Sequence, residues 1–130
     1  MDLPPTRTPE RPSRTPEEEI LFLRERLARA ERAAEQANGE RLPPDERERI
    51  ASAELTRHRE EREERGTERP AETAAIILDL APEGHDSQVG TLLAIAREQS
   101  VGAALSAAHK LGNPHIEDDF HRALVEYIRE

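Results

Sequence analysis

The chain has 130 residues, of which 36% are charged, and a formal net charge of −9. It contains two Phe, one Tyr and no Trp or Cys, so a core has to be built mainly from Ala, Leu and Ile. This composition suits small helical bundles better than β-sheets, and it provides neither disulfides nor thiolate metal ligands. No apolar run approaches the roughly 20 residues of a membrane-spanning helix, and no signal-peptide pattern is visible. We therefore expect an all-α, soluble, cytoplasmic protein.

The negative charge is distributed unevenly along the chain. Residues 1–66 carry a net charge of −3, because 14 Arg are interleaved with 17 acidic residues, whereas residues 67–130 carry −6. The interleaving leaves no basic stripe, and an acidic half is unfavourable for binding nucleic acid or an anionic membrane. We expect instead a protein partner or self-association, with a homo-oligomer as the expected form and no membrane insertion.

The first sixteen residues are rich in proline. Residues 1–16 contain five prolines and few side chains that could be buried, which predicts a disordered tail with stretches of polyproline II. At the end of this tail, Thr15, Pro16 and Glu18 have the spacing of a capping box, which opens a helix. Asn38-Gly39 is expected to close that helix.

The helix that begins after this box has an apolar seam at heptad spacing. Its members are three or four residues apart, which is the pattern of a helix that pairs with another helix. Alanine replaces larger residues toward the C-terminal end, so a partner would approach closely there but bury little area. The seam predicts coiled-coil pairing, with partner-binding residues Ile20, Leu23 and Leu27 and a continuation through Ala30, Ala34 and Ala37.

Residues 45–65 allow two interpretations. A second helix is expected to begin near Asp45, but its second half is charged on all sides. Ion pairs four residues apart, such as Arg59 with Glu63, would support a solvated helix, although each contributes only about 0.2–0.5 kcal/mol. A flexible charged linker is the alternative, and both interpretations stay open. Residues 17–66 are thus predicted to form a coiled-coil-like helix followed by a helical or flexible spacer.

Residues 67–130 are richer in Ala, Leu and Ile and are predicted to form a compact helical module. A turn at Pro82-Glu83-Gly84 and an N-cap at Asp86 or Ser87 separate its first two helices, and Ser100 is expected to cap the third. A unit of about 60 residues is only marginally stable, so we expect a partner or a second copy to cover an apolar face. The four short helices are expected at about 70–79, 86–99, 101–111 and 114–129.

The last helix carries the most distinctive polar cluster. Asn113 is a favourable N-cap, and Pro114 suits the first helical position because its missing N–H would be unpaired there. Helical periodicity places Phe120, Leu124 and Tyr127 in the core. Four polar residues outside this stripe form the candidate recognition surface for a partner: Asp118, Asp119, His121 and Arg122.

The same helix allows a metal-binding interpretation. His115 and Asp119 are four residues apart and share one face, so they could supply two ligands to Zn²⁺ or another divalent ion. The simpler interpretation is that the acidic residues interact with the helix dipole and that Asp118 pairs with Arg122. A third metal ligand would come from His85, His109 or Glu117.

No catalytic motif is present. The chain lacks a serine nucleophile elbow, a glycine-rich phosphate loop and an HExxH sequence, so we expect neither an enzyme nor a cofactor. The prediction is a protein–protein interaction or scaffold protein that pairs through the heptad helix and docks a partner through its C-terminal module. A metal-stabilised or metal-dependent module that uses His115 and Asp119 is the alternative.

Two segments of the C-terminal half resemble part of a known group of sequences. NPHIEDDFHRALVEYI (residues 113–128) and DLAPEGHD (residues 79–86) resemble a C-terminal segment of uncharacterised bacterial proteins, which is associated with larger proteins of secretion or conjugation-like systems. The resemblance covers residues 72–130 and implies an accessory module without catalytic residues. The surface and anchor that it implies consist of Pro114, Asp118, Asp119, Phe120, His121 and Arg122.

Overall fold

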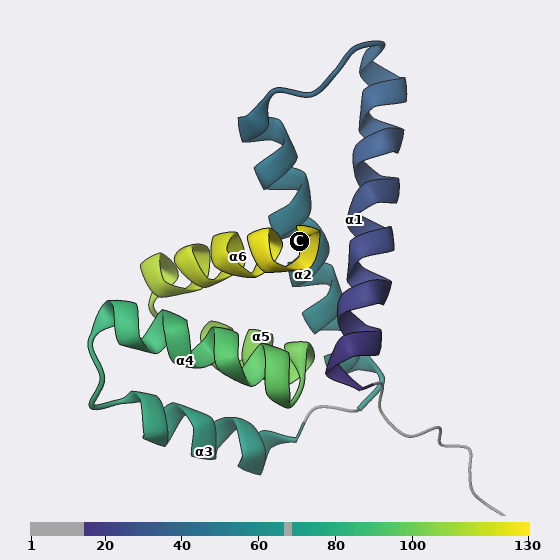
Figure 1. Cartoon of the computed structure of the whole chain (residues 1–130). Helices are drawn as coiled ribbons and strands as arrows, with labels where there is room; N and C mark the ends of the chain where they lie inside the picture. The colour runs from purple at the N-terminus through teal and green to yellow at the C-terminus, as the bar shows by residue number, and fades with distance from the viewer. Residues whose placement is uncertain (1–14, 67–68) are drawn as a thin grey trace, which may run out of the picture.

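The structure is a computed structural model that describes residues 15–66 and 69–130. In these ranges it contains six helices and no strand, which confirms the all-α class (Figure 1). The predicted Pro-rich tail lies outside the described residues as far as residue 14. The helices are α1 (Pro16–Asn38), α2 (Pro44–Glu64), α3 (Pro70–Leu80), α4 (His85–Glu98), α5 (Val101–Lys110) and α6 (Pro114–Arg129).

The first helix begins and ends where the local sequence predicts. Thr15 Oγ1 accepts the Glu18 N–H at 3.1 Å, and the Glu18 carboxylate accepts the Thr15 N–H at 3.0 Å, so the capping box is formed. The chain leaves α1 at Gly39, whose φ of 77° is a conformation that residues with a Cβ rarely adopt.

The charged second segment is a helix and not a linker. α2 continues to Glu64, and the predicted pair of Arg59 with Glu63 is present at 2.9 Å. Glu61 pairs across to Arg26 of α1 at 2.8 Å. α1 and α2 form an antiparallel hairpin whose turn projects away from the other helices (Figure 1). Contacts with α1 thus hold the charged second half of α2 in place, and the choice between helix and linker that the sequence left undecided falls on the helix.

The heptad seam of α1 faces the interior of its own chain. Ile20, Leu23 and Leu27 are 7%, 0% and 2% exposed and belong to the hydrophobic core. In this fold they hold α1 against α2 and the C-terminal helices. Pairing with a second chain through the same three side chains would require this packing to open, and that pairing stays a prediction.

One hydrophobic core joins the two parts that the sequence divides at residue 67. It takes side chains from all six helices, and α5 lies at its centre, with every residue from Val101 to Ala108 buried. The first and last helices also meet, because Arg24 Nε donates to the carbonyl oxygen of Ile128 at 2.6 Å. Residues 17–66 and 67–130 therefore share one core. Its largest fully buried side chains include Phe120, Leu23, Leu27, Leu55, Leu80, Leu92, Leu105, Leu124 and Ile128.

The bounds of the four C-terminal helices lie within one residue of the predicted ones. Ser100 and Asn113 cap α5 and α6 through their side-chain oxygens, as predicted. The predicted cap of α4 is wrong. That helix begins at His85 without a side-chain cap, so Asp86 and Ser87 already lie within it.

Candidate functional site

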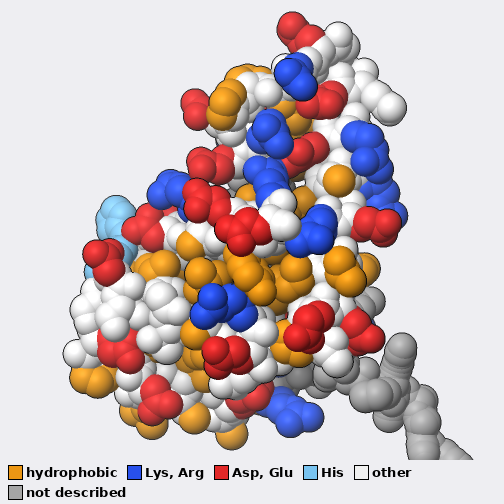
Figure 2. All heavy atoms as spheres, in the orientation of Figure 1, with side chains coloured by type: hydrophobic (Ala, Val, Ile, Leu, Met, Phe, Trp, Pro, Cys, Tyr) orange, Lys and Arg blue, Asp and Glu red, His pale blue; other side chains and the backbone are white. Residues whose placement is uncertain are grey.

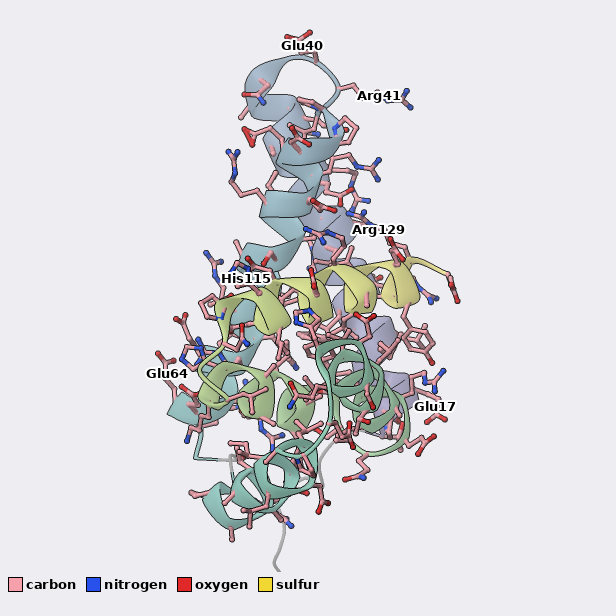
Figure 3. The ribbon with its side chains drawn as sticks, turned by 90° about the vertical axis from the view of Figure 1, so that its left-hand side faces the viewer. Glu17, Glu40, Arg41, Glu64, His115 and Arg129 are labelled. Atoms are coloured by element: carbon pink, nitrogen blue, oxygen red, sulfur yellow. The ribbon has the colours of Figure 1, made fainter. Side chains whose placement is uncertain are left out.

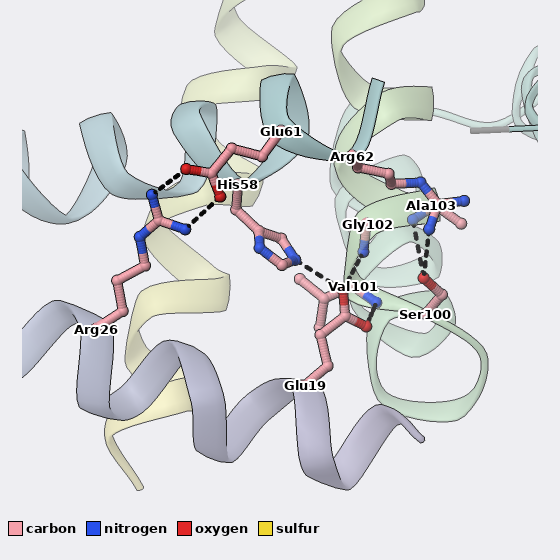
Figure 4. Close-up of polar contacts among 9 residues, drawn as sticks. All are labelled: Glu19, Arg26, His58, Glu61, Arg62, Ser100, Val101, Gly102 and Ala103. Atoms are coloured by element: carbon pink, nitrogen blue, oxygen red, sulfur yellow. Dashed lines mark hydrogen bonds and ion pairs between the residues drawn. The ribbon is translucent and has the colours of Figure 1, made fainter. Parts of the chain in front are cut away.

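A buried carboxylate links three helices at the base of the hairpin (Figure 4). Glu19 of α1 is only 7% exposed. Its two oxygens accept the N–H groups of Val101 and Gly102, the first residues of α5, at 2.8 and 2.9 Å. His58 Nε2 of α2 lies 2.8 Å from the same carboxylate. The N-terminus of a helix suits a negative charge because its N–H groups have no partner within the helix and its dipole is positive there.

The surroundings of Glu19 keep it ionised. Burial raises the pKa of its carboxyl group, but the hydrogen bond and charge of His58, together with the two backbone N–H groups, bring the pKa below its ordinary value of 4.5. His58 Nδ1 is buried and has no hydrogen-bond partner. Because Glu19 accepts hydrogen bonds from groups of its own chain, we assign this centre a structural role.

A second ion pair fixes the hairpin beside this centre. Arg26 Nε lies 2.7 Å from Glu54, and its two terminal nitrogens lie 2.8 and 2.9 Å from the two oxygens of Glu61. The bidentate contact with Arg26 lowers the pKa of Glu61. Sequence periodicity did not predict that Glu19 is buried or that Arg26 is partly buried between the helices, because it locates apolar stripes and does not show which charged residue will be enclosed.

The four predicted recognition residues of α6 are divided between two sides of that helix. Asp118, His121 and Arg122 line a groove of about 400 Å³ between α2 and α6. Asp119 and Arg122 line a smaller hollow of about 290 Å³ between α4 and α6. Arg122 therefore lies on the ridge between the two. On the α2 side, the groove is lined by Asp45, Glu48, Arg49 and Ser52, which the sequence did not connect with α6.

Ion pairs join three helices across this ridge. Arg122 lies 3.1 Å from Asp119 and 3.3 Å from Glu48 of α2, so the predicted pairing with Asp118 is not the one formed. Asp119 also lies 2.7 Å from His85 Nε2 of α4. The hydrogen bond from His85 lowers the pKa of Asp119 below its ordinary value. These contacts connect α4, α6 and α2 at the surface.

His121 is the buried member of the predicted surface. It is 6% exposed, and its Nδ1 lies 2.9 Å from Ser52 Oγ of α2. Burial lowers the pKa of His121 below 6.5, although the negative charges of Glu117 and Asp118 act to raise it. Glu117 lies 4.0 Å from His121 Nε2, which is longer than a hydrogen bond. We interpret the contact with Ser52 as an anchor between α2 and α6.

The candidate metal ligands form separate pairs. Asp119 is held by His85 at 2.7 Å, and Glu117 lies 3.2 Å from His109 Nδ1. His115 is exposed at the outer end of α6 (Figure 3). Within residues 15–66 and 69–130, no group of three or more His, Cys, Asp or Glu side chains could hold a metal ion.

An apolar helix face that the sequence did not predict lies on α3. This helix buries Thr73, Ile76 and Leu80. Its opposite side exposes Leu78, of which 73% is accessible. Figure 2 shows hydrophobic side chains along the lower edge of the molecule, where α3 lies in Figure 1. The sequence signal that could have predicted this face is the spacing of its apolar residues, which lie three or four positions apart. The exposed face consists of Ala71, Ala74, Ala75 and Leu78.

Comparisons of the chain with protein families, curated proteins and solved structures found no match. The resemblance of residues 72–130 to a segment of bacterial proteins therefore stays a prediction. In the part of the chain that the structure describes, no helix has the length and apolar character needed to cross a membrane.

Proposed function

We propose that this chain is a non-enzymatic protein–protein interaction module that docks a partner through the groove between α2 and α6. One observation supports this most directly. Three of the four polar residues predicted as a recognition surface, Asp118, His121 and Arg122, line a single groove together with residues of α2. The proposal does not use the predicted pairing through α1, because the seam of α1 is buried within the chain.

The side chains of the groove indicate what kind of group it accepts. Asp45 and Asp118 are exposed carboxylates on its two sides, and Val125 adds an apolar contact. Arg122 is already paired with Asp119 and Glu48, so its charge is largely neutralised. A volume of about 400 Å³ accommodates one or two side chains. The groove therefore suits a partner segment that presents a Lys or Arg side chain.

Capture of a partner by immobilised full-length protein tests this proposal. The double variant Asp45→Ala/Asp118→Ala removes the two exposed carboxylates of the groove, and we expect it to weaken capture of a partner by about tenfold or more, which corresponds to about 1.4 kcal/mol. The matched control is Glu25→Ala/Glu60→Ala, which removes two exposed carboxylates outside the groove. Unchanged capture by the groove variant, with an unchanged melting temperature, would show that this surface is the wrong one.

A further inference from the structure

We infer that the outward face of α3 is a second docking surface, which binds an amphipathic helix of a partner protein whose apolar stripe is flanked by Lys or Arg. This surface is independent of the groove between α2 and α6. Three observations carry the inference: the exposure of apolar side chains on α3, the position of α3 in the fold, and the charges along one edge of its outward face.

The exposed face has the shape of a helix-packing surface. Ala71, Ala74 and Ala75 are small enough to let another helix approach closely, and Leu78 projects beside them with 73% of its surface accessible. An exposed apolar patch with a polar rim on a soluble protein marks an interaction site. Apart from Leu78, the only large hydrophobic residue that is strongly exposed within residues 15–66 and 69–130 is Leu21 of α1.

The position of α3 leaves this face accessible. α3 packs mainly on α5 and lies at the edge of the molecule, at the opposite end from the turn of the α1–α2 hairpin (Figure 1). Its buried side is used by Thr73, Ile76 and Leu80. A helix of another protein can therefore lie along the outward side without displacing any of the six helices.

The charges beside the face select the partner. Glu72 and Asp79 are seven residues apart, so they lie along the same edge of α3. Arg62 lies 3.8 Å from Glu72 and offsets part of its charge, so the exposed Asp79 is the carboxylate that a partner meets first. α3 itself contains no Lys or Arg, and residues 69–98 contain five acidic residues and two Arg. A partner helix with Lys or Arg on the facing edge is attracted by Asp79 and by this acidic surplus, whereas one with Glu or Asp is repelled.

A second copy of the chain fits this face less well. In an antiparallel pair of α3 helices, Asp79 of one copy would lie beside Glu72 of the other, and each copy has a net charge of −9.

A pair of designed peptides tests the inference on the full-length chain. The first is a helix of about 18 residues, or five turns, with a Leu and Ala stripe flanked by Lys on one edge. The second carries Glu at the Lys positions. Binding is measured by NMR titration of the isotope-labelled protein. We expect the Lys peptide to shift the resonances of α3 and to bind at least about tenfold more tightly than the Glu peptide.

Three variants make the test specific. Asp79→Lys should weaken binding of the Lys peptide and strengthen binding of the Glu peptide, which a general loss of folding cannot do. Leu78→Glu should abolish the shifts on α3, whereas Leu21→Glu, at an exposed residue of α1, should leave them unchanged. Shifts located elsewhere, or an Asp79→Lys variant with unchanged preference, would overturn the inference. So would a concentration-dependent dimer of the native chain that Leu78→Glu disrupts, because a second copy would then occupy the face.

Discussion

His58 Nε2 lies 2.8 Å from the carboxylate of Glu19 in the interior of the protein, although the two residues are 39 positions apart in the sequence. The same carboxylate accepts the first two N–H groups of α5. One ionised side chain of α1 thus satisfies donors from α2 and α5. α1, α2 and α5 meet at one buried charge as well as in the apolar core.

Replacing this carboxylate by an amide should strongly destabilise the fold. In Glu19→Gln the charge that faces His58 and the N-terminus of α5 is lost, and an amide NH₂ takes the place of one acceptor. We expect the free energy of unfolding to fall by roughly 2–4 kcal/mol, measured by urea denaturation at neutral pH. Glu17→Gln, at an exposed residue two positions away, is the control and should change it by less than about 0.5 kcal/mol. Equal stability of the two variants would contradict the role assigned to Glu19.

The stability of the protein should depend on the protonation of His121. Its pKa is lowered in the folded state by burial, so the unfolded chain binds a proton more readily just below pH 6.5. The free energy of unfolding should therefore fall as the pH drops from about 7.5 to about 5. His121→Gln should make this dependence weaker, whereas His115→Gln, at an exposed residue, should leave it unchanged. Urea denaturation of the native chain and both variants across this pH range measures the effect, and parallel curves for the native chain and His121→Gln would refute it.

Replacing two nearby leucines of α1 by alanine should reduce stability very differently, because one lies in the buried seam and the other on the exposed side. Leu23→Ala removes a fully buried side chain and should cost about 2–5 kcal/mol, because the cavity is enclosed by the core. Leu21→Ala, at a residue that is 58% exposed, should cost less than about 1 kcal/mol. Thermal unfolding at several protein concentrations gives both values. If unfolding of the native chain depended on concentration and that of Leu23→Ala did not, the seam would be stabilising an oligomer and not the single chain.

Two glycines in helices should respond to alanine in opposite directions. A Cβ added at Gly102 would lie 2.5 Å from Cδ of Arg62, a side chain that is mostly buried, so Gly102→Ala should destabilise the protein by about 1–3 kcal/mol. A Cβ at Gly90 would meet no atom within 4 Å, so Gly90→Ala should stabilise α4 by about 0.5–1 kcal/mol. Melting temperatures compare the two directly, and a stabilised Gly102→Ala variant would mean that Arg62 moves aside without cost.

Much of the local structure could be predicted from the sequence. The ends of α1 and α6 follow from side-chain and backbone rules that act within four residues, such as the Thr15 capping box and the N-cap of Asn113. The core positions Phe120 and Leu124 follow from helical periodicity and are fully buried. Tyr127, by contrast, is only partly buried, because it lies at the edge of the stripe.

The parts that could not be predicted depend on contacts between distant segments. The seam through Leu23 and Leu27 has the same pattern whether its partner is a second chain or another helix of the same chain. The groove likewise needed the position of α2 relative to α6, which no local signal gives. The pairing of Arg122 with Glu48 and Asp119 depended on that arrangement, so a prediction from helix spacing alone chose Asp118 instead.

The shared core also determines when this chain can fold during its synthesis. α1 and α2 emerge from the ribosome before the other four helices, but Leu23 and Leu27 belong to a core that those later helices complete. α6, which supplies Phe120, Leu124 and Ile128, is made after the other five. At a synthesis rate of about 5–20 residues per second, the apolar side chains of α1 remain without their native neighbours for several seconds. The emerging hairpin is therefore the stage at which the apolar side chains of α1 are least protected from contact with other chains.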